Sequence, residues 1–205
     1  NGSGQGTVIT VAAPWVNISG ISVTDAGMSA GRYGIHINDV DHCNITDVFV
    51  NLTDIGIYLN SADHCHIINC TAVDNNIGVY SISSNYNEFG RITAMRNPGN
   101  GIQLSTSGSV GPNWIHNGTY VDNGGAYTET AGIFLWGGTS KNNLIENNFI
   151  YDNYNSISCR ASGITGNLFR DNTIMNSTLQ GVRYTNGAGP NEFYHNIFMN
   201  NTADL

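Results

Sequence analysis

A four-residue phrase that recurs along the chain is the feature that most constrains its fold. The phrase is glycine, a branched aliphatic residue, a variable residue and usually a second apolar residue, as in Gly34-Ile35-His36-Ile37. It starts at Gly34, Gly56, Gly78, Gly101, Gly132, Ser156 and Gly181, in steps of 22, 22, 23, 31, 24 and 25 residues. A period of about 20–50 residues is typical of repeat proteins, in which each unit packs on its neighbours.

A second phrase, Asn-x-Ile or Asn-x-Phe, recurs at similar intervals, once in each repeat. It starts at Asn87, Asn113, Asn143, Asn167 and Asn191, and the earlier repeats have Cys65, Cys43 and Val16 in its place. Around it, apolar or Asn residues alternate with variable ones, which indicates short strands joined by tight bends. In the clearest repeat we expect Ile145, Asn148, Ile150, Asn153 and Ile157 to point inward.

Three short strands per repeat have no partner within their own repeat, so each must pair with its equivalent one repeat away. This arrangement predicts an all-β fold, a right-handed single-stranded parallel β-helix (solenoid) of about eight coils of 22–30 residues. Residues 1–205 are expected to form this one domain, either complete or as a segment of a longer array. Stacked Asn side chains would satisfy one another's hydrogen bonds inside it. A leucine-rich repeat would need a Leu-rich consensus, and a propeller blade needs about 40 residues.

The charge of the chain excludes some partners. The formal net charge is −8, only 11% of residues are charged, and Lys141 is the single lysine. Without a basic run to follow phosphates, nucleic acid is not an expected partner. No apolar run approaches the roughly 20 residues of a membrane-spanning helix.

Eight Asn-x-Ser/Thr sequons predict a glycosylated surface. Asn1 precedes the repeats, and the other seven fall at outward or corner positions: Asn17, Asn44, Asn51, Asn69, Asn117, Asn176 and Asn200. N-glycans would imply an extracellular or cell-surface protein. An Asn- and Thr-rich chain also generates sequons by chance, so that alternative remains open.

Two copies of Asp-His-Cys, 22 residues apart, should stack on successive coils. Asp41, His42, Asp63 and His64 are weak candidates for a zinc or copper site, because these residue types ligate metals. Cys43 and Cys65 could instead form a disulfide, since stacked residues lie about 5 Å apart. In the third interpretation both cysteines are small buried residues of the Asn column. No cofactor is expected, and calcium or a transition metal is the alternative.

An outward column that follows the repeat glycine is the candidate ligand surface. It contains His36, Tyr58, Tyr80, Gln103, Phe134, Ser158 and Arg183. Tyr58, Tyr80 and Phe134 are candidates for stacking on sugar rings, although aromatic residues also favour strands for packing alone. The longest insertions, 105–112 and 123–131, flank the fifth coil, and the second contains Tyr127 and Glu129. Long loops on a solenoid often carry binding functions.

No catalytic residues are predicted. Acid–base catalysis needs titratable groups that converge on one pocket. Asp74, Asp122 and Asp152 share an outward column, but Arg96 separates them and they are spread along the rod.

Residues 55–76 (IGIYLNSADHCHIINCTAVDNN) resemble the parallel β-helix repeat family, in the NosD-like style of bacterial and archaeal surface proteins. The resemblance extends over roughly residues 7–201 and implies the fold. That family includes polysaccharide lyases, sugar epimerases, a periplasmic protein tied to copper-enzyme maturation and many non-catalytic surface arrays. The resemblance therefore does not select one function.

The favoured interpretation is an extracellular structural or assembly module, either a surface array or a fibre of β-helices that associate end to end. Such contacts between unlike surfaces generate filaments when they do not close into a ring. One alternative is a carbohydrate-binding adhesion module. The other is a polysaccharide lyase or epimerase.

Overall fold

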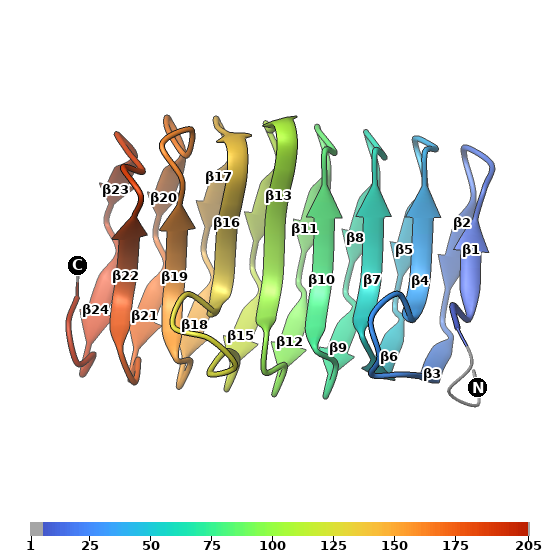
Figure 1. Ribbon diagram of the computed structural model, residues 1–205, viewed down its shortest axis with the longest axis horizontal. Helices are drawn as coiled ribbons and strands as arrows, with labels where there is room; N and C mark the ends of the chain where they lie inside the picture. The colour runs from blue at the N-terminus through green and yellow to red at the C-terminus, as the bar shows by residue number, and fades with distance from the viewer. Residues whose placement is uncertain (1–5, 205) are drawn as a thin grey trace.

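The computed structural model describes residues 6–204, which form 24 strands and contain no helix. The strands build three parallel sheets of eight strands each, and every strand pairs with its equivalents one coil away. The chain is a right-handed parallel β-helix of eight coils, as the repeat predicted (Figure 1).

The three sheets run along the whole rod. Sheet A contains β1 (Ile9–Val11), β4 (Tyr33–Asn38), β7 (Ile55–Asn60), β10 (Ile77–Ile82), β13 (Asn100–Val110), β16 (Ala131–Ser140), β19 (Asn155–Arg160) and β22 (Gln180–Thr185). Sheet B contains β2 (Asn17–Ser19), β5 (Asn44–Thr46), β8 (His66–Ile68), β11 (Glu88–Gly90), β14 (Trp114–His116), β17 (Leu144–Glu146), β20 (Leu168–Arg170) and β23 (Glu192–Tyr194). Sheet C contains β3 (Ser22–Gly27), β6 (Phe49–Thr53), β9 (Thr71–Val73), β12 (Thr93–Met95), β15 (Thr119–Val121), β18 (Phe149–Tyr151), β21 (Thr173–Met175) and β24 (Ile197–Met199).

The interior of the coil is lined by the residues that the alternation predicted. Ile145, Ile150, Asn153 and Ile157 are 0% exposed and Asn148 is 2% exposed. Successive side chains of a strand point to opposite faces, so their neighbours lie outside. The strand register confirms the predicted outward column of sheet A, because each member pairs with the next one in the following coil: His36, Tyr58, Tyr80, Gln103, Phe134, Ser158 and Arg183.

The repeat glycine is required because the coils approach closely there. A Cβ built on Gly34 would lie 2.5 Å from the carbonyl oxygen of Gly56, and one on Gly56 would lie 2.5 Å from that of Gly78. Non-bonded carbon and oxygen atoms do not pack so closely. The phrase found in the sequence therefore marks a packing constraint between coils.

Buried Asn ladders hold the corners between the sheets. The amide oxygen of Asn97 accepts a hydrogen bond from the backbone N–H of Asn75 at 2.9 Å, and Asn123 does the same for Asn97 at 3.2 Å. Similar ladders run through Asn87 and Asn113, and through Asn148 and Asn172. Each ladder satisfies backbone donors that the corner leaves unpaired.

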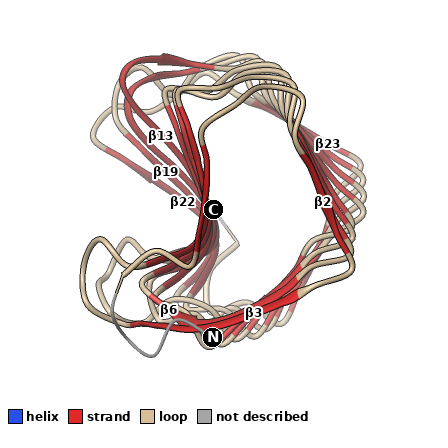
Figure 2. Cartoon of the chain, turned by 90° about the vertical axis from the view of Figure 1, so that its right-hand side faces the viewer, coloured by secondary structure: helices blue, strands red, loops and turns tan. Residues whose placement is uncertain are grey.

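One side of the rod is bordered by loops. Seen nearly end on, the three sheets enclose the core, and segments project past the edges of sheet A (Figure 2). The predicted insertion at 105–112 is mostly strand: β13 continues to Val110 and pairs with the extension of β16, with a register shift between Thr106 and Ser109. The second insertion forms a loop between β15 and β16, drawn in yellow in Figure 1.

Candidate functional site

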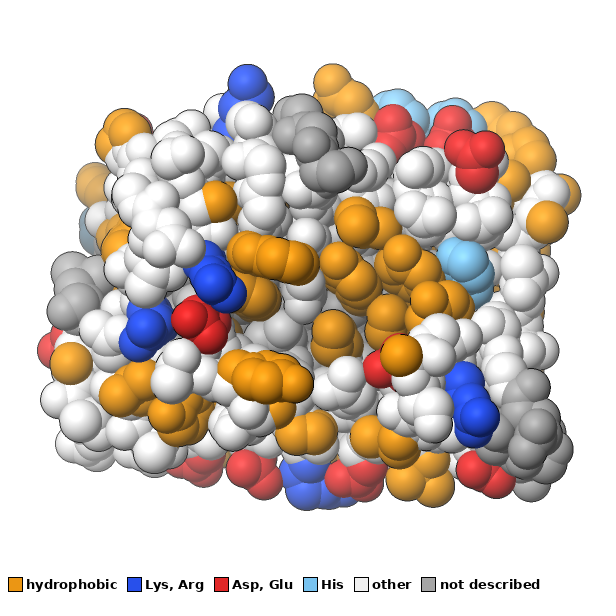
Figure 3. Space-filling model, viewed as in Figure 1, with side chains coloured by type: hydrophobic (Ala, Val, Ile, Leu, Met, Phe, Trp, Pro, Cys, Tyr) orange, Lys and Arg blue, Asp and Glu red, His pale blue; other side chains and the backbone are white. Residues whose placement is uncertain are grey.

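A recess of about 370 Å³ lies on the outer face of sheet A, beside the loop between β15 and β16. Its lining comes from the starts of β10 and β13, from β16 and β19, and from the loop: Asn76, Ile77, Gly99, Asn100, Gln103, Tyr127, Glu129, Thr130, Phe134, Trp136 and Arg160. Figure 3 looks onto this face, where hydrophobic side chains gather over the middle strands beside basic and acidic ones. The recess therefore combines apolar and charged groups on one open surface.

Aromatic rings dominate the recess. Tyr127 is 74% exposed and Trp136 is 42% exposed, whereas Phe134 is only 6% exposed. The rings of Phe134 and Trp136 are nearly parallel, with an interplanar angle of 8° and centroids 6.5 Å apart. Phe134 is thus a largely covered part of the lining, and Trp136 and Tyr127 offer the accessible ring surface.

The loop that carries Tyr127 is fixed by hydrogen bonds. The side-chain amide of Asn155 donates to the carbonyl oxygens of Thr128 and Thr130 at 3.0 and 2.8 Å. The hydroxyl of Thr130 donates to the carbonyl of Tyr127 at 2.7 Å and accepts from the N–H of Gly125 at 2.8 Å. These contacts hold the loop in one arrangement before any ligand arrives.

Polar groups lie beside the rings. The amide of Asn100 donates to Oε1 of the nearly buried Gln103 at 2.8 Å, which fixes the orientation of both amides. A guanidinium nitrogen of Arg160 lies 3.9 Å from a carboxylate oxygen of Glu129, beyond hydrogen-bond distance. Oriented amides and a loosely paired cation are groups that hydroxyls or an anion can bind.

The predicted sugar-stacking residues Tyr58 and Tyr80 lie further along the same face, as a stack. The ring of Tyr58 packs between those of His36 and Tyr80, with centroids 4.8 and 5.3 Å away. Burial raises the pKa of Tyr58 to about 12, and the neighbouring Tyr33 and Tyr80 add to this. Both ring faces of Tyr58 are covered, so its hydroxyl and ring edge are the parts that face outward.

The four metal candidates take other roles. The ring of His42 stacks between Trp15 and His64, with centroids 4.1 and 5.1 Å away. The carboxylate of Asp41 accepts from the N–H of Asp63 at 2.8 Å. Asp63 in turn accepts from the N–H of Asn85. Within residues 6–204, no group of three or more His, Cys, Asp and Glu side chains is arranged to hold a metal ion.

The Cys43–Cys65 disulfide is not formed in the structure. Both cysteines are free and buried, and the backbone N–H of Cys43 donates to Sγ of Cys65 at 3.4 Å. The reason is that Cys65 takes the place of Asn in a ladder: it accepts from the coil before it, and its own N–H donates to Asn87 at 2.7 Å. Each thiol also donates to the backbone carbonyl two residues before it, Cys43 to that of Asp41 and Cys65 to that of Asp63.

The sequons that the structure describes lie on the surface; Asn1 is outside the described residues. Asn17, Asn69, Asn117, Asn176 and Asn200 are exposed, and Asn44 and Asn51 are half-buried. Four of them, Asn69, Asn117, Asn176 and Asn200, occupy left-handed corners with φ between 53° and 56°. Five of the seven positions are therefore accessible, and glycan attachment stays a prediction.

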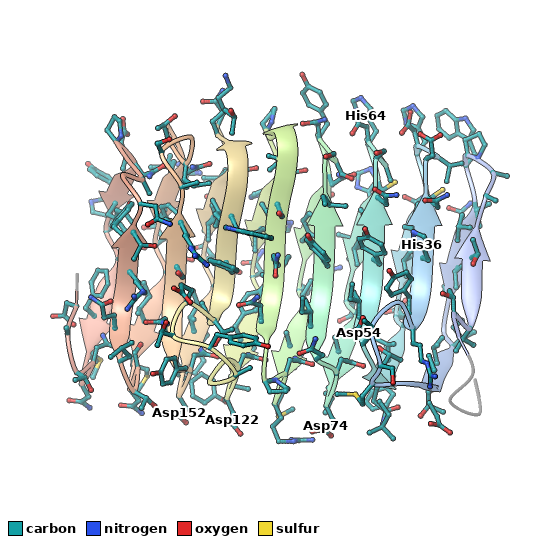
Figure 4. The ribbon with its side chains drawn as sticks, in the orientation of Figure 1. His36, Asp54, His64, Asp74, Asp122 and Asp152 are labelled. Atoms are coloured by element: carbon teal, nitrogen blue, oxygen red, sulfur yellow. The ribbon has the colours of Figure 1, made fainter. Side chains whose placement is uncertain are left out.

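The acidic column does not form a pocket. Asp74, Asp122 and Asp152 lie along the edge where sheet C turns into sheet A, whereas His64 lies at the opposite edge (Figure 4). Arg96 binds Asp74 with two hydrogen bonds of 2.8 Å. These bonds lower the pKa of Asp74, against a smaller opposing effect of burial. The arrangement is an exposed ion pair, and Asp122 in the next coil adds a further electrostatic attraction to Arg96.

A second cluster, on sheet B, was not foreseen. Glu88 accepts from Nδ1 of His66 at 2.7 Å and from Nε2 of His116 at 2.9 Å. The ring of Trp114 stacks on His116, with centroids 3.8 Å apart, and its indole N–H donates to Glu146 at 2.8 Å. A shallow recess of about 360 Å³ adjoins this cluster.

Sequence reasoning missed Trp136 and Arg160 in the main recess. Each lies two residues after a member of the predicted outward column, and they pair with each other across β16 and β19. The period-2 alternation places them on the same outer face, so the next outward column was the signal that could have found them.

No helix among the residues described has the length and apolar character that crossing a membrane would need.

Comparison with solved structures identifies other parallel β-helices. The Dettilon tailspike protein superposes with a TM-score of 0.70 at 15% identity, covering 90% of this chain and 41% of that chain. A periplasmic alginate epimerase, AlgG, has a TM-score of 0.69 at 18% identity, covering 86% and 49%. The alginate lyase from Paenibacillus sp. has a TM-score of 0.57 at 16% identity, covering 90% and 80%. At these identities the likeness shows the fold alone.

This chain spans less than half the length of the tailspike and of the epimerase. No curated protein matches it in sequence. A family model does match: the family described as periplasmic copper-binding protein (NosD), over residues 5–158.

The His, Cys, Asp and Glu side chains of residues 6–204 do not form a copper site of three or more ligands. Copper prefers thiolate, thioether and imidazole ligands. Burial raises the pKa of the Cys65 and Cys70 thiols to about 12 and about 11, which opposes the thiolate form. His42 and His64 have no third ligand beside them within residues 6–204.

The family match itself covers well over half of the chain, and the chain therefore belongs to the periplasmic copper-binding protein (NosD) family.

Proposed function

We propose that the protein binds a polysaccharide on the outer face of sheet A, in an extracellular or periplasmic location. The observation that carries the proposal is the recess in which the exposed rings of Tyr127 and Trp136 lie beside Arg160. The tailspike, the alginate epimerase and the alginate lyase support a role with polysaccharides, and the family description supports the location.

The chemistry of the recess suits a sugar. An aromatic face covers the apolar C–H face of a pyranose ring, and the two amides and the guanidinium supply directed hydrogen bonds. The anchored loop at 123–130 reduces the ordering cost of binding.

We propose binding and not turnover. Hydrolysis of a glycosidic bond generally uses two carboxylates at the same sugar. Glu129 is the one carboxylate among the described residues that line the recess. A lyase or epimerase remains the alternative, and an assay for unsaturated or epimerised products from the bound polysaccharide separates the two.

A glycan-binding panel with matched variants tests the proposal. Trp136→Ala is expected to weaken polysaccharide binding about ten-fold or more, which corresponds to about 1.4 kcal/mol. Trp114→Ala is the control, since Trp114 is 39% exposed against 42% for Trp136 but lies on sheet B. Equal effects of the two substitutions, or binding that neither changes, would count against the recess.

The N-glycosylated structural module stays a second proposal. Its support is the surface position of the seven described sequons. A mass spectrum of the native protein should show glycan mass that is lost from Asn117→Gln, and a mass equal to the bare chain would refute it. Assembly into an array or fibre by end-to-end contact is tested by electron microscopy, where single rods at high concentration would contradict it.

A further inference from the structure

Two arginines are close neighbours on sheet A: Arg160 lines the recess, and Arg183 lies on the next strand, outside it. Arg183 on β22 pairs with Ser158 on β19, and Arg160 on β19 pairs with Thr185 on β22. Ser158 is itself the neighbour of Phe134, and Arg160 is the neighbour of Trp136. The two guanidinium side chains are therefore diagonal neighbours on adjacent strands, close enough to contact one ligand, and they continue the surface that the rings begin.

Polar atoms at this place lack partners. Ser158 is 0% exposed and its hydroxyl makes no hydrogen bond. The Nε–H of Arg183 and the hydroxyl of Thr185 are also buried without a partner. Buried polar groups are normally hydrogen-bonded, and leaving them unpaired costs free energy. Three unpaired atoms on two adjacent strands indicate a place where a ligand supplies the missing partners.

The arginines are also poorly neutralised. Arg183 donates only a long bond, 3.3 Å, to the neutral amide of Gln180. Arg160 lies 3.9 Å from Glu129, whereas Arg170 binds Glu146 at 2.6 Å. In a chain of net charge −8, this is a local excess of positive charge that faces outward beside the recess.

We propose that Arg160, Arg183 and Ser158 form a subsite for the carboxylate of an acidic sugar, so that the bound polysaccharide contains uronic acids. This inference rests on the proposed function and names its ligand class. A guanidinium binds a carboxylate through two parallel N–H···O bonds, and the free Nε–H of Arg183 is one of the donors this requires. The hydroxyl of Ser158 supplies a third donor. The rings of Trp136 and Tyr127 hold the neighbouring sugar.

Binding of defined oligosaccharides tests the subsite. Oligouronates, sulfated oligosaccharides and neutral oligoglucans of the same length are titrated into the protein and into Arg160→Gln, Arg183→Gln and Arg183→Lys. Arg91→Gln is the control, because it changes the net charge equally at an exposed corner outside the recess. Thermal melts confirm that each variant is folded.

We expect oligouronates to bind more tightly than neutral glucans, and binding to weaken with added salt. Each Gln variant should lose about ten-fold in uronate affinity, Arg183→Lys should recover only part of it, and Arg91→Gln should change it less than about two-fold. Neutral glucans bound as tightly as uronates, with Trp136→Ala still abolishing binding, would overturn this inference and leave the proposed function standing. Preference for sulfated oligosaccharides would overturn the assignment to uronates, and no binding of any saccharide would overturn both.

Discussion

Nε2 of His116 lies 2.9 Å from Oε1 of Glu88, although the two residues are on neighbouring coils and not directly paired. The contact exists because the residue opposite His116 is Gly90. A Cβ on Gly90 would lie 2.8 Å from Nε2 of His116, so any larger residue would displace the imidazole. Asn117 hydrogen-bonds Nδ1 of His116 at 2.8 Å, which assigns the proton to Nε2 if the amide nitrogen donates.

Glu88→Gln should change the free energy of unfolding in a pH-dependent way, because it removes the negative charge of this cluster. Burial alone would raise the pKa of Glu88, but the hydrogen bonds from His66 and His116 outweigh it and the pKa is lowered from its ordinary value of 4.5. Because the folded pKa is the lower one, the stabilisation is present above pH 4.5 and is lost as the pH falls through the folded value. We expect a difference on the order of 1 kcal/mol near neutral pH, measured by denaturant unfolding.

The control for Glu88→Gln is Glu192→Gln, an exposed position in the same outward column of sheet B. It should change stability little at any pH. If the Glu88 variant is as stable as the parent near neutral pH, or if the difference grows toward acid, the assigned role of the carboxylate is wrong.

All four cysteines should react with a thiol reagent only after unfolding. Each is buried, and burial raises the pKa of Cys65 to about 12. The reactive thiolate is therefore scarce and shielded in the folded protein. Alkylation without reductant, followed by mass measurement, should label none in the folded protein and four in denaturant; two labels in denaturant would indicate a disulfide.

Asn97→Ala should be far more destabilising than Asn60→Ala. Asn97 is 0% exposed, accepts from Asn75 and donates to Ala72 at 3.1 Å, so its loss leaves buried backbone groups unpaired. We expect a loss of about 2–4 kcal/mol in the free energy of unfolding. Asn60 stacks on Asn38 through a similar amide contact of 3.0 Å, but at the surface, where water replaces it. Similar losses at both positions would contradict the importance assigned to the buried ladder.

Thr130→Ala should weaken saccharide binding without changing the melting temperature greatly. The substitution removes both hydroxyl contacts that fix the loop at Gly125 and Tyr127. A looser loop loses more conformational entropy when it binds, so affinity should fall about three- to ten-fold. Thr130→Ser keeps the hydroxyl and should bind like the parent; if both variants behave alike, the loop is not preorganised by this residue.

The sequence was sufficient to predict the coil because the fold depends on local periodicity. Ile145 and Asn148 were placed inside from alternation alone, and the repeat glycine gave the register of sheet A. The pairing of each strand with its equivalent follows from a near-constant repeat length. The repeat therefore predicts the register of the aromatic column between coils, although it does not predict how exposed the column is.

The recess was harder to predict because it depends on departures from the repeat. Tyr127 belongs to an insertion. Its position depends on hydrogen bonds from Thr130 to Tyr127 and from Asn155 to Thr130, which no repeat pattern encodes. Phe134 belongs to the predicted column but is covered, while Trp136 in the next column is accessible. Periodicity predicts which face of the sheet a residue lies on. It does not predict how exposed the residue is, because neighbouring loops and side chains can cover it.

The central claim is that a polysaccharide contacts the outer face of sheet A at Trp136. The chain has three tryptophans, so replacing Trp15 and Trp114 by Phe leaves Trp136 as the only indole. With the polysaccharide at saturation, we predict a shift in the emission of this variant and protection from a soluble quencher. The matched variant that retains only Trp114 should show neither change. Protection of Trp114 and not of Trp136, with binding intact, would contradict the account.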